Sequence, residues 1–155
     1  MVIKKYILVC FIFSLCYSQN WIQNQRTEKQ FKEAVSNYNS GRYATSVIIL
    51  NKIIDSGFES FHEQALLLLL KSQVALNKSE EAKKTAKIFF SDYPSSPFLE
   101  YAMDSIGDLF VNNANYESAY RMFVRSKELS NVSERKVEID KKLLRLIKIS
   151  LSTKF

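Results

Sequence analysis

A pattern of small and aromatic residues recurs three times along the chain at a nearly constant spacing, and this recurrence constrains the fold more than any other feature. When Gly41, Asn77 and Ala114 are aligned, the steps between them are 36 and 37 residues. Repeats of this length are typical of helical arrays, in which each unit of two helices completes its hydrophobic core only against its neighbour. Because such arrays usually bind other proteins, the pattern indicates a class of function without indicating a partner.

The composition favours a helical domain. The chain has 155 residues, enough for one domain, and only 3 Gly and 2 Pro, too few for a turn-rich β-sandwich or barrel. Its hydrophobic and charged fractions, 46% and 25%, are those of an ordinary globular protein. The sequence therefore predicts an all-helical fold.

The N-terminus has the features of an export signal. Lys4 and Lys5 precede an apolar run over residues 6–16, which is about half as long as the roughly 20 apolar residues that span a bilayer. Small residues at the −3 and −1 positions predict cleavage before Gln19, so residues 1–18 form the expected signal peptide. Retention of this segment as a membrane anchor is the alternative.

Both cysteines, Cys10 and Cys16, lie within the predicted signal peptide. Cleavage would leave a mature chain without cysteine, which excludes disulfides, thiol catalysis and Cys-based metal sites together. Lipoprotein processing normally requires a small residue directly before the modified Cys, whereas Val9 precedes Cys10 and Leu15 precedes Cys16. We therefore expect no lipid anchor.

The spacing of apolar residues predicts three helix pairs over residues 27–131, after a short polar lead-in over residues 19–26. Gly41 is expected to end the first helix in a left-handed conformation, and Ser79 to cap the second helix of the second pair. Six consecutive apolar residues, 65–70, predict a helix that is buried on nearly all sides. A buried strand is the alternative for this run.

Two small residues, Gly107 and Ala119, are expected to let the helices of the third pair approach each other closely. Replacing either residue with Leu should overpack the contact at a cost of roughly 1–3 kcal/mol. An unchanged melting temperature of an Ala119→Leu variant would show that these two helices do not pair.

The last segment, residues 132–155, carries the excess positive charge of the mature protein. Residues 19–131 contain 13 basic and 13 acidic side chains, whereas the last segment contains 7 basic and 3 acidic ones. Its apolar spacing predicts a basic helix that caps the array. This helix could solvate the open end of the array, dock on another domain or subunit, or lie on an anionic membrane surface. The residues expected to face inward are Ile139, Leu143, Leu146 and Ile147, and those expected mostly on the other face are Lys141, Lys142, Arg145 and Lys148.

These features resemble the tetratricopeptide repeat, a family whose unit is two antiparallel helices with small and aromatic residues at fixed positions. The third unit matches best, through Gly107, Tyr116, Ala119 and Phe123, whereas the second has Ser79 where Tyr is usual. No unit carries the early Trp that is common in the family. The resemblance implies an all-α fold in which antiparallel helix pairs stack as a right-handed α-solenoid of about three repeats plus a C-terminal helix.

The slightly lengthened units and the junction at residues 93–97, Tyr-Pro-Ser-Ser-Pro, resemble the bacterial envelope branch of this family. That branch includes the outer-membrane assembly lipoprotein BamD and the cell-division coordinator CpoB. The resemblance implies a periplasmic or cell-envelope location after export by a cleaved signal. The missing lipidation Cys departs from BamD, and the chain holds about three and a half units where five would be expected.

The sequence contains no constellation typical of catalysis, cofactor binding or metal binding. His62 is the only histidine; it is expected at the start of a helix, and no nucleophile elbow or Gly-rich turn accompanies it. Nucleic-acid binding is not expected either, because the chain is predicted to be exported and shows no interleaving of aromatic and basic residues. The sequence therefore predicts a protein that is not an enzyme and binds no cofactor.

The resemblance implies that the first helices of each pair line a concave groove, which binds an envelope protein or peptide. Phe31 and Val35 replace the Lys and Asn with which some family members hold a terminal carboxylate, so that clamp is absent. The groove is expected to be partly apolar and partly acidic, which would suit a helix or extended peptide of basic character. For Phe31, Val35 and Tyr38, ordinary core between units is the alternative. The implied groove residues are Phe31, Val35, Tyr38, Leu67, Lys71, Tyr101, Asp104 and Asp108.

The sequence thus predicts an exported scaffold that mediates protein–protein interaction in the bacterial cell envelope. The resemblance suggests outer-membrane assembly or cell division as the process. The alternative is the N-terminal arm of a larger envelope protein, with a regulatory or substrate-recognition role. A reading frame that continues past Phe155, or an insoluble isolated chain, would favour this alternative.

Overall fold

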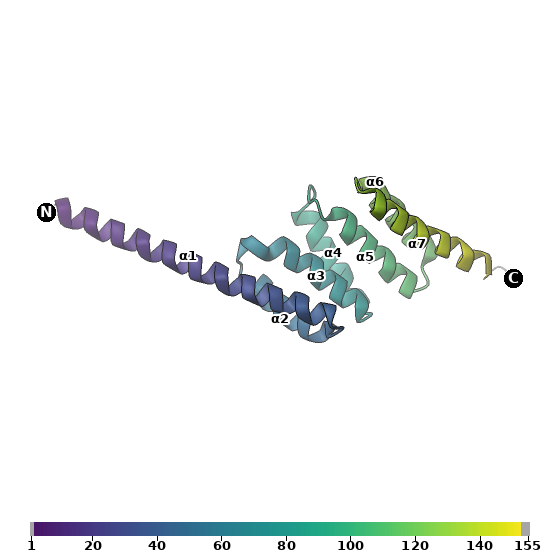
Figure 1. The fold of residues 1–155 in the computed structure, drawn as a ribbon, viewed down its shortest axis with the longest axis horizontal. Helices are drawn as coiled ribbons and strands as arrows, with labels where there is room; N and C mark the ends of the chain where they lie inside the picture. The colour runs from purple at the N-terminus through teal and green to yellow at the C-terminus, as the bar shows by residue number, and fades with distance from the viewer. Residues whose placement is uncertain (1, 153–155) are drawn as a thin grey trace.

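The computed structural model describes the backbone of residues 2–152 and the side chains of residues 21–149, 151 and 152. Its helices follow one another in chain order along the long axis of the molecule (Figure 1), and no strand occurs among residues 2–152. The prediction of an all-helical fold is confirmed. The helices are α1 (Val2–Asn39), α2 (Tyr43–Asp55), α3 (His62–Ala75), α4 (Ser79–Asp92), α5 (Leu99–Asn112), α6 (Tyr116–Leu129) and α7 (Ser133–Ser152), with a 3-10 turn, η1 (Glu59–Phe61), before α3.

Each helix packs against its neighbours in the sequence, and the odd-numbered helices also pack against one another. Each helix from α1 to α6 contacts the helix that follows it. In addition, α1 contacts α3 and α3 contacts α5, and ion pairs join α5 to α7. The odd-numbered helices therefore lie side by side in one row, and this row provides the surface on which the candidate site is built.

The three aligned positions of the sequence pattern have the same backbone geometry. Gly41, Asn77 and Ala114 each follow a helix and have φ values of 73°, 54° and 55°. At each position the N–H donates to the carbonyl three residues earlier, and the next N–H donates to the carbonyl five residues earlier. This arrangement satisfies carbonyl groups that the end of a helix would otherwise leave open. The left-handed helix end predicted for Gly41 is confirmed.

Five residues after each of these turns, the second helix of the pair has a small side chain with no exposed surface. The three residues are Ser46, Ala82 and Ala119, each 0% exposed. Ser46 differs from the other two by its hydroxyl group, which donates a hydrogen bond of 3.0 Å to the carbonyl of Ala34 in α1. The buried hydroxyl of Ser46 therefore has a hydrogen-bond partner, whereas the other two pairs bury the methyl group of an alanine at the same position.

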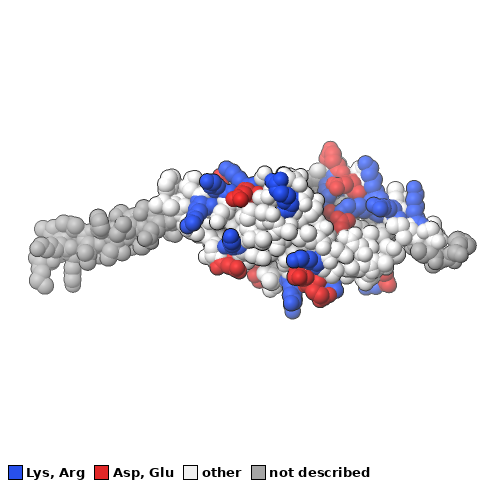
Figure 2. Space-filling model, turned by 90° about the horizontal axis from the view of Figure 1, so that it is seen from below, with Lys and Arg blue, Asp and Glu red and all other residues white. Residues whose placement is uncertain are grey.

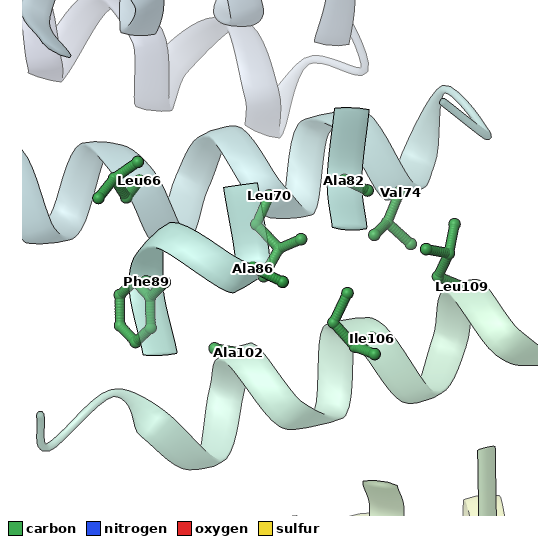
Figure 3. Packing of buried hydrophobic residues seen from close by; sticks show 9 residues of the cluster. All are labelled: Leu66, Leu70, Val74, Ala82, Ala86, Phe89, Ala102, Ile106 and Leu109. Carbon is green, nitrogen blue, oxygen red and sulfur yellow. The ribbon is translucent and has the colours of Figure 1, made fainter. Parts of the chain in front are cut away.

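The apolar run at residues 65–70 lies in α3, so the strand alternative for this run is wrong. None of its six side chains is exposed, because α2, α4 and α5 all contact α3. Burial on several sides explains why this helix is apolar around most of its circumference. Figure 3 shows the cluster that α3 forms with α4 and α5, which consists of Leu66, Leu70, Val74, Ala82, Ala86, Phe89, Ala102, Ile106 and Leu109.

The structure differs from the sequence prediction at two helix starts. Residues 19–26 belong to α1 rather than to a separate lead-in; this stretch has no Gly or Pro, and Gln and Arg favour helix. Thr27 also behaves as an interior residue, because its hydroxyl donates to the carbonyl of Gln23 one turn earlier. Ser79 is the first residue of α4 rather than its N-cap, and its hydroxyl accepts a hydrogen bond from the amide of Asn113.

The predicted signal peptide, residues 1–18, falls on a part of the chain whose side chains lie outside the described set, so its cleavage stays a prediction. The first described side chains, Trp21 and Ile22, are exposed and add nothing to the core. Among the described residues, no helix combines the length and the apolar character that crossing a bilayer requires.

Gly107 is the position in α5 where an added side chain would disturb the third pair. A Cβ atom there would lie 2.6 Å from Cδ1 of Phe123, whose ring is buried. We expect Gly107→Ala to lower the free energy of unfolding by roughly 1–3 kcal/mol, measured by urea denaturation, because the ring has no free space to enter.

The matched control is Lys84→Ala on the exposed side of α4, which should change the free energy of unfolding by less than about 0.5 kcal/mol. Ala in place of Gly normally stabilises a helix by about 1 kcal/mol. A more stable Gly107→Ala variant would therefore show that α5 and α6 are not closely packed at this point.

Candidate functional site

A hollow of about 400 Å³ opens on the row of odd-numbered helices. The described residues that line it come from α1, α3, α5 and α7, and none comes from an even-numbered helix. We call it the odd-helix hollow. Because helices two apart lie side by side, it brings together residues as distant in sequence as Tyr38 and Lys142.

The hollow is lined by five of the eight residues that were predicted to form the binding groove. The other three predicted residues do not line it. Phe31 stacks on Phe61, with 5.5 Å between the ring centroids, and Leu67 packs against the core cluster of α3, α4 and α5, so both contribute to the core. Val35 is half-buried on α1. The five predicted residues that do line the hollow are Tyr38, Lys71, Tyr101, Asp104 and Asp108.

The side chain of Asp104, which is 10% exposed, joins α5 to α7. Its Oδ2 atom lies 2.6 Å from Nη2 of Arg135, and both of its carboxylate oxygens lie 2.9 Å from Nζ of Lys142. Lys142 also lies 2.8 Å from Oδ2 of Asp108, and Arg135 bonds Glu138 on its own helix. Two cations of α7 thus neutralise the two aspartates of α5.

Three further residues of the hollow were not predicted from the sequence: Arg135, Glu138 and Lys142. Lys142 was expected mostly on the outer face of α7, but it points toward α5. Ile147 was expected to face inward, but it is 46% exposed. Arg135, Ile139, Lys142 and Leu146 follow one another at steps of four, three and four residues. Lys142 therefore shares a helix face with Ile139 and Leu146, which are buried, and this spacing was the signal for its inward orientation.

The carboxylates expected in the groove line the hollow, but three cations line it as well, so its charge is balanced rather than acidic. The cation without a carboxylate is Lys71, which makes no ion pair with any described residue. Its Nζ atom lies 5.4 Å from the ring centroid of Tyr101, and Cζ of Arg135 lies 4.8 Å from the same centroid. Nε of Arg135 is also buried without an acceptor among the described groups. Two donors beside Tyr101, Nζ of Lys71 and Nε of Arg135, therefore have no acceptor among the described groups.

Burial in the hollow shifts three pKa values toward the neutral form of each group. It lowers the pKa of Lys71, and the nearby charge of Arg135 lowers it further. It raises the pKa of Asp108, although the hydrogen bond from Lys142 acts in the opposite direction, and it raises the pKa of Tyr38. Poor hydration of the hollow explains all three shifts. An anion placed beside Lys71 would reverse the shift at that residue.

A second hollow, of about 550 Å³, lies between the α4–α5 and α6–α7 connections. Its lining includes Pro94, Phe98 and Val132, and its only charged lining residue within the described part of the chain is Glu100. Tyr101 lines both hollows. This second hollow offers apolar contact area next to the odd-helix hollow but brings no reactive or charged cluster.

His62 begins α3, as the sequence predicted. Its Nδ1 atom lies 2.7 Å from the hydroxyl of Tyr93, so the imidazole connects the start of α3 with the end of α4. Within the described side chains, no three His, Cys, Asp or Glu residues lie close enough together to hold a metal ion.

No family profile, curated protein or solved structure matches the chain. The geometry and charge of the hollow are therefore the basis for inferring a function.

Removing the charge of Asp104 should weaken the attachment of α7. We expect Asp104→Asn to lower the free energy of unfolding in urea by about 2–3 kcal/mol, because Arg135 and Lys142 would each lose an ionised partner in a largely buried place. The matched control is Asp140→Asn, which breaks the half-exposed bridge between Asp140 and Lys127 of α6 and should cost less than about 1 kcal/mol. Equal losses in the two variants would contradict a special role for Asp104.

The protonation of Asp108 provides a test of burial. Because its folded pKa is raised above its unfolded pKa, its contribution to stability is fully present below the ordinary Asp pKa and is lost as pH rises through the raised pKa. We expect an NMR titration of its carboxyl carbon to have a midpoint above the usual Asp range. Lys142→Met should move that midpoint higher, whereas the exposed control Lys148→Met should not. A midpoint at or below the usual range would show that the ion pair with Lys142 outweighs the effect of burial.

Proposed function

We propose that this chain is a tetratricopeptide-like module that binds a segment of another protein in the odd-helix hollow. The observation that carries the proposal is the repetition of one turn geometry at Gly41, Asn77 and Ala114, 36 and 37 residues apart. A period of this size supports stacked helix pairs. On this proposal α1 to α6 are about three repeats of a right-handed α-solenoid, and α7 is the C-terminal helix.

The position of the hollow supports a role in binding. Helical arrays present extended concave surfaces formed by equivalent helices of successive units, and partners bind along these surfaces. The odd-helix hollow is lined by such equivalent helices, and Tyr38 and Tyr101 offer it two aromatic rings. Aromatic side chains provide a large contact area and commonly dominate the energetics of interfaces.

The charge of the hollow supports a partner segment with an acidic side chain. Lys71 is a half-buried cation that makes no ion pair within the described part of the chain, and its pKa is lowered. A carboxylate from the partner would meet Lys71 where little water screens the attraction. A preference for an acidic partner is opposite to the sequence prediction, which was a basic peptide. The reason is that Arg135 and Lys142 already form ion pairs with Asp104 and Asp108.

The N-terminal sequence supports a location for this activity. Export is favoured by Lys4 and Lys5, by the short apolar run that follows them and by the small residues before Gln19. We therefore propose that the module works in the periplasm or cell envelope. The partner is then an envelope protein or peptide, and outer-membrane assembly or cell division is the process that the family resemblance suggests.

We propose no catalytic role, since the carboxylates of the hollow are engaged in ion pairs between α5 and α7.

Affinity capture from a bacterial envelope extract would test this proposal. We expect the wild-type chain to retain a partner and Lys71→Glu to reduce retention at least about tenfold, since a reversed charge repels the partner carboxylate. Tyr38→Ala should also reduce retention, by removing apolar contact. The control Lys84→Glu, at an exposed position of α4, should retain the partner. Circular dichroism should show that all variants remain helical. Equal retention by wild type and Lys71→Glu would exclude the hollow as the binding site.

A further inference from the structure

The outer face of α7 carries an exposed apolar line that the core does not use. Val137, Leu144 and Leu151 are 54%, 59% and 56% exposed. They are seven residues apart, so they follow one line along the helix over a length of about 21 Å. Exposed large apolar residues that form a line, rather than occurring singly, indicate a contact surface.

The opposite face of α7 attaches the helix to the rest of the fold. Ile139 and Leu146 are buried in a cluster with Ala119 and Phe123 of α6, and Arg135 and Lys142 pair with Asp104 of α5. The exposed line is therefore not needed to hold α7 in place. A partner surface can contact it without disturbing the core or the odd-helix hollow.

A row of positive charge runs beside the apolar line. Lys141, Arg145 and Lys148 are exposed, are three or four residues apart, and make no ion pair with any described residue. No carboxylate follows Asp140 in the sequence. Figure 2 shows Lys and Arg side chains next to uncharged surface at the end of the molecule where α7 lies. A cationic row beside an apolar line is the pattern of a helix that lies in the interface of an anionic membrane.

We propose that α7 binds an anionic phospholipid surface, with Val137, Leu144 and Leu151 entering the acyl boundary and Lys141, Arg145 and Lys148 contacting the lipid phosphates. A second copy of this chain is a poorer occupant, because pairing two such faces brings the two cationic rows together. α7 is the last described helix of the row (Figure 1), and the exposure of Val137, Leu144 and Leu151 makes this line accessible to a flat surface. This binding does not depend on the protein-binding role proposed for the hollow.

A fluorescent side chain placed on the apolar line tests this proposal in the full chain. The variant combines Trp21→Phe, which removes the only native Trp, with Leu144→Trp. We expect the indole emission to shift to shorter wavelength when vesicles containing phosphatidylglycerol are added, and to remain unchanged with vesicles of phosphatidylcholine alone. Adding Arg145→Gln and Lys148→Gln should raise the lipid concentration for half-maximal shift at least about tenfold.

Two controls make the result specific to α7. Lys84→Gln with Lys87→Gln, which neutralises two exposed cations of α4, should leave the half-maximal lipid concentration unchanged. Ile88→Trp, at an exposed apolar position of α4, should report no shift in the Trp21→Phe background. An equal shift with both lipids, or no shift with either, would overturn the proposal. A shift that appears without lipid as protein concentration rises would also overturn it, in favour of pairing between two copies of the chain.

Discussion

The close approach of the two helices in each pair depends on small side chains at one recurring position of the second helix. Ser46, Ala82 and Ala119 occupy this position with no exposed surface, and in the third pair Gly107 brings α5 against the ring of Phe123. Larger residues there would separate the helices of a pair. The row of odd-numbered helices, and therefore the hollow on its surface, exists because these approaches are close.

The carboxylate of Asp104 connects the fold with the chemistry of the hollow. By pairing with Arg135 and Lys142 it attaches α7 to the row and holds the guanidinium group of Arg135 next to the ring of Tyr101. The same pairs neutralise Asp104 and Asp108 of α5, so Lys71 is the one described cation of the hollow that has no carboxylate partner among the described side chains. One largely buried ionic contact thus both joins α7 to α5 and affects which charge the hollow offers to a ligand.

The sequence predicted what local chemistry controls and missed what depends on tertiary contacts. The turn at Gly41 was predictable because glycine favours a left-handed helix end, whereas the left-handed backbone at Asn77 and Ala114 was not predicted. The helical state of residues 19–26 was missed because no apolar stripe marks it. The inward orientation of Lys142 could not be derived from its own helix, since it is set by Asp104 and Asp108 on α5.

The left-handed backbone at Ala114 has a consequence for the stability of the third helix pair. Gly41 adopts such a conformation freely, and Asn also occurs there at helix ends, whereas Ala loses about 1–2 kcal/mol in it. The third turn is therefore strained when considered alone, and the contacts that α5 and α6 make with neighbouring helices offset that strain. We therefore expect this pair to depend on its neighbours for its stability, rather than to form independently.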